Sequence, residues 1–185
     1  PLIKTMIMND KNSTLSLKLD RRPNSIQVDP NFDTFRLLST GERPSSLGRF
    51  FGARQQLLVI PATAEKSMID AWEELASQWN RTYGNVAVIQ DNEIDSLPTD
   101  QPVWLLGWEN KFLHDSAQRF SSSVYELSTS EKKLTVINDN FSKDQHALVV
   151  MDVDNIKNPF GFISANNAET VKQLARKLPH YKSYG

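Results

Sequence analysis

The sequence contains no cysteine, which excludes disulfide bonds, thiolate catalysis and cysteine-ligated zinc. No apolar run approaches the roughly 20 residues that a membrane-spanning helix requires, so we expect no membrane insertion. Neither positive nor negative side chains are in clear excess, because 21 basic residues nearly balance 22 acidic ones and the formal net charge is -1. Nucleic-acid binding requires a concentrated basic face, so we expect no nucleic-acid partner.

The motifs of several common enzyme classes are missing as well. A short apolar segment, LLVIP, is followed by ATAEKS, which contains no glycine. Dinucleotide and phosphate sites need glycine at this point so that the backbone can approach the anion. Neither a G-x-S-x-G nucleophile elbow nor an H-E-x-x-H zinc motif occurs. We therefore expect no catalytic residue, no cofactor and no metal ligand here, and we do not expect this chain to be an enzyme.

Two short motifs resemble metal sites without completing them. His114 and Asp115 form a pair that would need further ligands on neighbouring helices. The segment that begins at Asp152 resembles the opening of a calcium loop, but its sixth and twelfth positions hold Lys157 and Ile163 instead of glycine and glutamate. A solvated histidine and acidic residues that cap a turn explain both motifs better.

The first part of the chain shows the alternation of a half-buried strand. In STLSLKLD, Leu15, Leu17 and Leu19 lie on one side and polar residues on the other. RRPN is typical of a turn, and SIQVD alternates again. We predict a β-hairpin within residues 1–38, belonging to an adjacent β-domain. Turn-forming residues in STGERPSS then predict a linker over residues 39–56.

Residues 57–185 alternate between short apolar strands and amphipathic helices. Between Ser67 and Trp79 the apolar residues fall on one helical face, and Ser67 with Asp70 resembles a capping box. Further helices are expected over Asn110–Phe120 and in NAETVKQLARKL. The expected strands are LLVIP, NVAVIQ, PVWLLGW, SVYELS, KKLTVIND, HALVVMDVD and FGFISA. This order predicts an α/β domain with a mostly parallel, Rossmann-like sheet flanked by helices.

Polar residues gather where the expected parallel strands end, which is where open α/β sheets bind ligands. The candidate rim comprises Asp91, Asn92, Trp108, Glu109, Asn110, Asp152 and Asp154. Such a rim would suit a sugar, a peptide, a nucleotide or a cation. The same residue types also cap helices, and capping is the favoured interpretation. A third hypothesis is a hydrolase or transferase that uses Asp91, Glu109 or Asp152.

Four phrases resemble a known kind of protein region: IQVDPNFDTFRLL, ERPSSLGRFFGARQQLLVIPA, PVWLLGWENKF and FGFISANNAETVKQLARKLPHYKSYG. They are similar to the C-terminal accessory region of bacterial gluzincin zinc metallopeptidases, which resemble aminopeptidase N. The resemblance covers most of Val28–Gly185. The family's H-E-x-x-H and distal glutamate have no matching positions here, so no catalytic role is carried over.

The resemblance implies a non-catalytic structural or interaction domain of a larger exported metallopeptidase. Its partner would be the rest of the parent polypeptide, and zinc would belong to the parent. The location would be periplasmic or secreted, although composition alone leaves the cytoplasm open. Both ends of the chain, Pro1 and HYKSYG, also predict an excerpt from a longer protein. The oligomeric state is left open.

Overall fold

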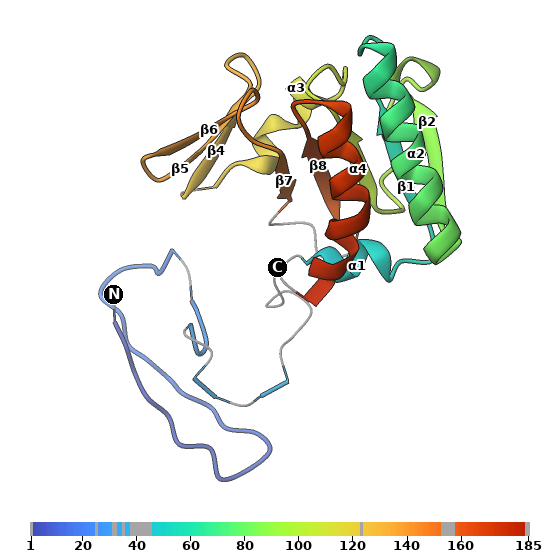
Figure 1. Ribbon diagram of the computed structural model, residues 1–185. Helices are drawn as coiled ribbons and strands as arrows, with labels where there is room; N and C mark the ends of the chain where they lie inside the picture. Colours follow the sequence, from blue (N-terminus) through green and yellow to red (C-terminus); the bar gives the residue numbers. More distant parts are fainter. Residues whose placement is uncertain are drawn as a thin grey trace. The chain divides into compact units, whose positions relative to one another are not determined.

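The computed structural model describes residues 2–24, 26–30, 33–34, 36–37, 46–122, 124–152 and 158–183. For residues 182 and 183 it describes the backbone alone. The chain divides into two compact units, Pro1–Leu37 and Leu38–Gly185 (Figure 1).

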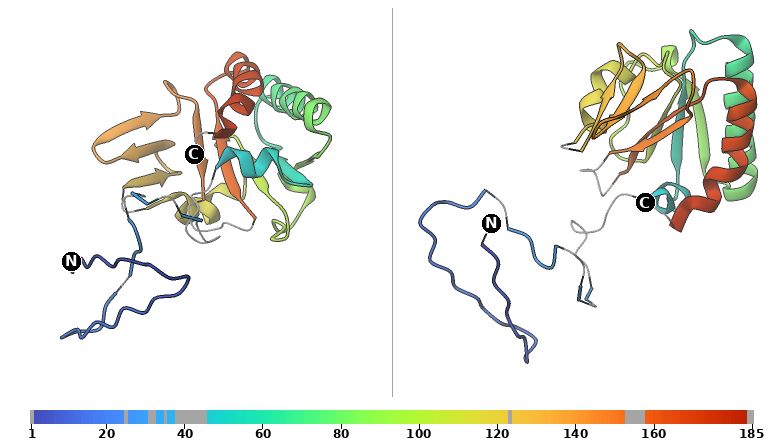
Figure 2. Two further views of the ribbon diagram at one scale, coloured as in Figure 1. Left: turned by 90° about the horizontal axis from the view of Figure 1, so that it is seen from below. Right: turned by 60° about the vertical axis from the view of Figure 1, so that its left-hand side comes forward.

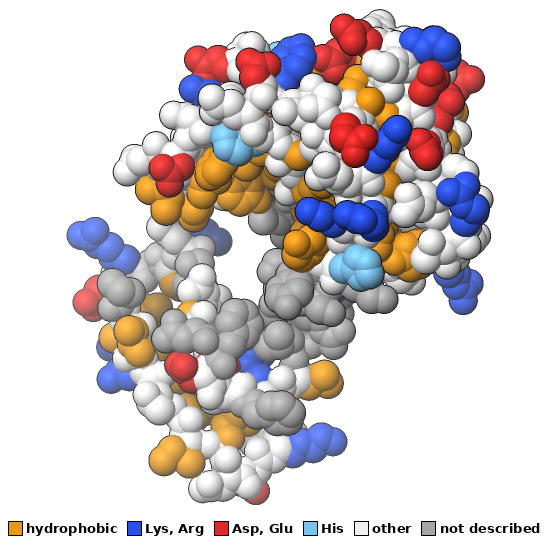
Figure 3. Space-filling model, in the orientation of Figure 1, with side chains coloured by type: hydrophobic (Ala, Val, Ile, Leu, Met, Phe, Trp, Pro, Cys, Tyr) orange, Lys and Arg blue, Asp and Glu red, His pale blue; other side chains and the backbone are white. Residues whose placement is uncertain are grey.

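The described residues of the first unit form no strand, so the predicted hairpin is not confirmed there. Leu15, Leu17 and Leu19 are 48%, 43% and 43% exposed, and apolar side chains show on the surface of this unit (Figure 3). An isolated two-stranded hairpin is marginal in water, and an alternating face needs a second layer to bury it. Within the described residues of this unit, no second layer covers these leucines.

Hydrogen bonds to the side chain of Asp29 hold a turn in the first unit. The Asp29 carboxylate accepts hydrogen bonds from the backbone N–H of Asp33 at 2.8 Å and from Thr34 Oγ1 at 2.6 Å. Arg36 donates to the same carboxylate at 3.4 Å and to the carbonyl oxygen of Val28 at 2.9 Å. The turn is therefore held by one side chain rather than by a strand ladder.

A five-stranded sheet is the centre of the second unit, with strand order β2-β1-β3-β8-β7. The first four strands in this order are parallel, and β7 is antiparallel to β8. The mostly parallel α/β sheet is thus confirmed, but as a mixed sheet. Its strands are β1 (Gln56–Ile60), β2 (Val86–Gln90), β3 (Val103–Leu106), β7 (Leu148–Met151) and β8 (Phe160–Ser164).

Different layers cover the two faces of this sheet (Figure 2). One face packs against helices α1 (Leu47–Phe51), α2 (Lys66–Tyr83) and α4 (Ala168–Lys177), the last continuing into the 3₁₀ helix η4 (Leu178–Ser183). The other face packs against α3 (Leu113–Ser116), the 3₁₀ helix η3 (Ala117–Phe120) and a three-stranded antiparallel sheet. That smaller sheet consists of β4 (Tyr125–Ser128), β5 (Lys133–Val136) and β6 (Asp139–Ser142).

Helix α2 follows the predicted apolar face but begins differently. Trp72, Leu75, Ala76 and Trp79 are buried as the periodicity predicts. The N-cap residue is Glu65, which makes no side-chain capping bond, so the predicted capping box at Ser67 is wrong. Gly84, with φ of 68°, ends the helix in the left-handed region that glycine tolerates best.

The first helix of the second unit lies inside the predicted linker. Within residues 39–56, α1 buries Leu47, Phe50 and Phe51, and β1 begins at Gln56. The Phe50 ring stacks on Trp104 with centroids 3.8 Å apart. Turn-forming residues before α1 concealed these apolar positions, because a five-residue helix is too short to show a clear periodicity.

Segments between β3 and β7 also differ in detail from the predictions. The expected helix over Asn110–Phe120 is present only as α3 and η3, both short. Strands β4 and β5 were expected, whereas β6 was not. Its sequence, DNFS, has exposed polar residues at its start, so its apolar alternation is too brief to predict a strand.

The direction of β7 is the largest correction. Its register pairs Leu148 with Ser164 and Met151 with Gly161, which is antiparallel. Only eight residues separate the end of β7 at 151 from the start of β8 at 160, and a parallel connection needs a dozen or more. The carboxyl end of β7 therefore lies at the opposite edge of the sheet from the carboxyl ends of β1, β2 and β3.

We expect Gly161→Ala to lower the free energy of unfolding by about 3 kcal/mol, because a Cβ there would overlap the Trp104 ring and press on Phe50. Gly84→Ala is the matched control: nothing lies within 4 Å of its Cβ position, so only backbone strain of about 1 kcal/mol is expected. Urea unfolding measures both values. Equal losses would show that the ring stack does not require the glycine.

Candidate functional site

Asp91 ties together the loops that leave three neighbouring strands. It follows β2 as the first residue of the 3₁₀ helix η2 (Asp91–Glu93) and is 3% exposed. Its carboxylate oxygens accept hydrogen bonds from the backbone N–H of Ala62 at 2.9 Å and of Lys111 at 2.8 Å. Ala62 follows β1 and Lys111 follows β3. Both carboxylate oxygens therefore hold together the loops at the edge of the sheet where β1, β2 and β3 end.

Asn110 makes a second connection at the same edge. It is 4% exposed, and its Nδ2 donates to the carbonyl oxygens of Val59 at 2.8 Å and Leu106 at 3.4 Å. Its Oδ1 accepts from the backbone N–H of Phe112 at 3.2 Å. The N-cap residue of α3 is Phe112, so the predicted capping role of Asn110 is replaced by a link between β1 and β3.

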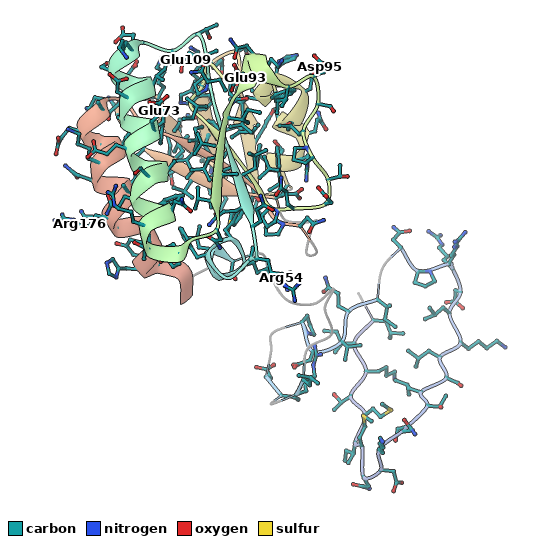
Figure 4. The ribbon with its side chains drawn as sticks, turned by 90° about the vertical axis from the view of Figure 1, so that its right-hand side faces the viewer. Arg54, Glu73, Glu93, Asp95, Glu109 and Arg176 are labelled. Carbon is teal, nitrogen blue, oxygen red and sulfur yellow. The ribbon has the colours of Figure 1, made fainter. Side chains whose placement is uncertain are left out.

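Glu109 connects this edge to the three-stranded sheet. Its Oε1 lies 3.3 Å from Lys132 Nζ and 3.2 Å from Lys143 Nζ. The side chain is 32% exposed and lies at the end of the sheet opposite to Arg54 (Figure 4). Burial by itself raises the pKa of Glu109, but the hydrogen bond and charge of Lys143 and the charge of Lys132 outweigh it, so the pKa lies below its usual value of 4.5.

Trp108 is part of the core rather than an exposed ligand shelf. It is 7% exposed, and its ring meets Phe162 edge-on with centroids 5.0 Å apart. Gly107 before it has φ of 73°, and its N–H donates to the Ile163 carbonyl oxygen at 2.8 Å. Gly107 thus turns the chain out of β3 and directs the indole onto the sheet.

The remaining rim residues do not complete a ligand site. Because β7 is antiparallel, Asp152 lies at the opposite edge, where its Oδ2 is 2.7 Å from Arg119 Nη2. The Arg119 guanidinium lies 3.9 Å from the Phe160 ring centroid. Asn92 is exposed in η2. Asp154 lies outside the described residues. Asp91 and Glu109 therefore share an edge that Asp152 does not, which counts against one catalytic centre that uses all three.

Three cationic partners at these positions were missed by the sequence analysis. Lys132, Lys143 and Arg119 lie 23, 34 and 33 residues from the carboxylates that they contact. No local spacing rule links residues at such separations, so no signal in the sequence could identify these pairs.

A cavity of about 500 Å³ lies at the edge opposite to Asp91 and Glu109. Residues that precede β1, β3 and β8 line it, among them Arg54, Gln101 and Asn158, and Figure 4 shows Arg54 at this end of the unit. No residue of the predicted rim lines this cavity, because that rim was expected at the carboxyl ends of the strands.

The described part of the chain contains no cluster of side chains suited to bind a metal ion. No group of three or more His, Asp or Glu side chains there is arranged to hold an ion. His114 is exposed, and its Nδ1 lies 3.2 Å from Thr129 Oγ1. Among the helices of the described ranges, none has the length and apolar character to cross a membrane.

Comparisons with known proteins yield no relative: no family model, no curated protein and no solved structure matches this chain.

We expect Asp91→Ala to lower the free energy of unfolding by about 2–3 kcal/mol, because two backbone N–H groups would lose their acceptor. Asn92→Ala changes an exposed neighbour and should stay within about 0.5 kcal/mol of the unchanged protein. Chemical unfolding of both variants checks this. If the two variants prove equally stable, Asp91 does not hold the strand ends together.

Glu109→Gln should destabilise the protein only above the range in which Glu109 titrates. A depressed folded-state pKa gives a contribution that is fully present above the unfolded value of 4.5 and is lost as the pH falls through the folded value. Partial exposure keeps this contribution below about 1 kcal/mol. Melting curves between pH 3 and pH 7 should converge at low pH for the unchanged protein and the variant.

The control for this titration is Glu126→Gln, since Glu126 is exposed on β4 and forms no ion pair within the described ranges. At pH 7 its melting temperature should match that of the unchanged protein, because no ion pair among the described residues is removed. A Glu109→Gln curve with the same behaviour would contradict the role of the two lysines.

Proposed function

We propose that this chain is a non-catalytic accessory domain of a larger exported, aminopeptidase-like metallopeptidase, with a Rossmann-like α/β fold. One observation carries the proposal: the polar residues at the carboxyl ends of β2 and β3 are occupied by the protein itself. Asp91 and Asn110 bind backbone groups of neighbouring loops, and Glu109 binds two lysines. The site that open α/β sheets use for ligands is thereby used to hold the domain together.

The first unit supports an interaction with a further polypeptide. Its apolar side chains at Ile3, Ile7 and Ile26 are 83%, 82% and 87% exposed. Apolar surface of this extent is typical of segments that a partner covers. The partner we propose is the rest of the parent polypeptide, where the predicted hairpin would join a neighbouring β-domain.

The parent's class and location rest on the four phrases that resemble gluzincin accessory regions. They cover most of Val28–Gly185, and they support a zinc-dependent parent that is exported to the periplasm or secreted. In this proposal the accessory domain contributes packing or a binding surface, while the zinc and the peptide chemistry belong to the parent's catalytic part.

A small-molecule binding module is the alternative, and the geometry supports it less. Asp91, Trp108 and Asn110 are buried, and Asp152 lies at the other edge of the sheet. A thermal-shift screen with sugars, nucleotides and amino acids tests it: a stabilisation that Asn92→Ala or Glu109→Gln removes would favour the alternative over the accessory role.

We expect the purified chain to show no hydrolysis of fluorogenic aminoacyl amides, with or without added zinc. Turnover that a chelator abolishes would overturn the accessory proposal. The reading frame upstream of Pro1 should encode an H-E-x-x-H segment, and its absence would overturn the proposed parent class.

The exposed leucine face gives the interaction a direct test. Leu17→Lys should weaken binding of this chain to the separately expressed upstream polypeptide by roughly tenfold, because a charge would replace a buried contact of about 1.4 kcal/mol or more. Ser16→Lys, which adds the same charge on the alternate side, should bind as the unchanged chain does. Equal weakening by both would contradict a specific leucine face.

A further inference from the structure

Four buried polar side-chain atoms among the described residues have no hydrogen-bond partner: Trp72 Nε1, Trp108 Nε1, His146 Nδ1 and Ser164 Oγ. Trp72 lies on the helix-covered face of the sheet. The other three lie on the opposite face, and each comes from a different segment. An unpartnered buried polar group costs about 1–3 kcal/mol, so three such groups on one face of the sheet call for an explanation.

Strand register places Ser164 between the other two residues. Ser164 is 0% exposed and follows Phe162 by two residues on the same face of β8. Trp108 packs its ring on Phe162, from the side of β3. On the other side, Leu148 pairs with Ser164, and His146 precedes Leu148 by two residues.

Three contacts bind these segments to one another in pairs. Gly107 N–H donates to the Ile163 carbonyl oxygen at 2.8 Å, next to Trp108 and Ser164. Lys143 Nζ lies 3.2 Å from Glu109 Oε1, between the Trp108 and His146 segments. Asn166 Nδ2 donates to the Asp144 carbonyl oxygen at 3.3 Å. The segments that carry Trp108, His146 and Ser164 are therefore neighbours on this face of the sheet, and the region where they meet is called the corner below.

We propose that this corner, defined by Trp108, His146 and Ser164, is an internal binding site for one water molecule. The indole N–H can only donate, so the ligand must offer an acceptor, which excludes ammonium and metal cations. Water accepts from Trp108 Nε1 and donates to His146 Nδ1 and to Ser164 Oγ. These three bonds are the usual number for a buried water.

The site also has a defined closing contact. The Phe141 ring meets His146 edge-on with centroids 5.2 Å apart, and the ion pair between Glu109 and Lys143 spans the segments beside it. Exchange of the water with solvent then requires this part of the three-stranded sheet to move away from the main sheet. The water therefore reports on the contact between the two sheets.

A crystal structure of the chain at a resolution that shows ordered water tests the site directly. We expect one density peak within about 2.7–3.2 Å of Trp108 Nε1, His146 Nδ1 and Ser164 Oγ. Direct hydrogen bonds between these side chains and protein groups, with no peak among them, would overturn the proposal.

Solution NMR provides a second test with a control inside the same molecule. The Trp108 indole proton should show a dipolar cross-peak to water, with opposite signs in laboratory-frame and rotating-frame spectra, which separates contact from proton exchange. The Trp79 indole proton is also buried but donates to the Ala175 carbonyl oxygen at 2.8 Å, so it should show none. Trp108→Phe and Trp79→Phe assign the two signals.

Ser164→Ala should weaken or remove the Trp108 cross-peak, and Glu109→Gln should shorten the residence time of the water without removing it. A cross-peak that is equally strong at Trp79, or that is unchanged in Ser164→Ala, would overturn the proposal. Measurement on the unchanged protein keeps the test valid if a variant fails to fold.

Discussion

Trp104 stacks on Phe50 directly over Gly161, and this contact holds together the helix-covered half of the second unit. The indole lies on the central strand β3 and is fully buried, and its Nε1 donates to Gln56 Oε1 at 3.1 Å. Trp79 of α2 approaches the same ring with a centroid distance of 6.3 Å. One side chain thereby joins α1, α2 and three strands, and it explains why a glycine must stand at position 161 of β8.

The edge of the sheet where ligands are usually bound shows how polar residues can serve structure alone. Buried carboxylates and amides are costly unless each atom is paired. Asp91 and Asn110 meet this condition by binding backbone groups on neighbouring loops. Their pairing leaves little chemistry for a substrate, which fits an accessory role, whereas Trp108 and Ser164 leave atoms that a single water would satisfy.

Periodicity predicted the elements with long, regular apolar patterns. The buried face of α2, with Trp72 and Trp79, follows from spacing alone, as does α4, where Asn167 caps the helix by accepting from Thr170 N–H at 2.8 Å. Helix α1 was not predicted because five residues are too few to show a helical period, and strand β6 was not predicted because it begins with exposed polar residues. The rim residues from Asp91 to Asn110 lie at the predicted edge of the sheet. Their roles, however, depend on partners that lie far away in the sequence.

The amino-acid sequence by itself determined the α/β class, the main strands and helices, and the absence of cysteine chemistry, because these depend on composition and on local spacing. Tertiary structure alone decided the direction of β7, which moves Asp152 to the far edge, and the pairing of Glu109 with Lys132 and Lys143. It also decided that Asp91 and Asn110 bind the backbone. Such outcomes depend on which segments meet in space, and burial then requires every polar atom that meets there to find a partner.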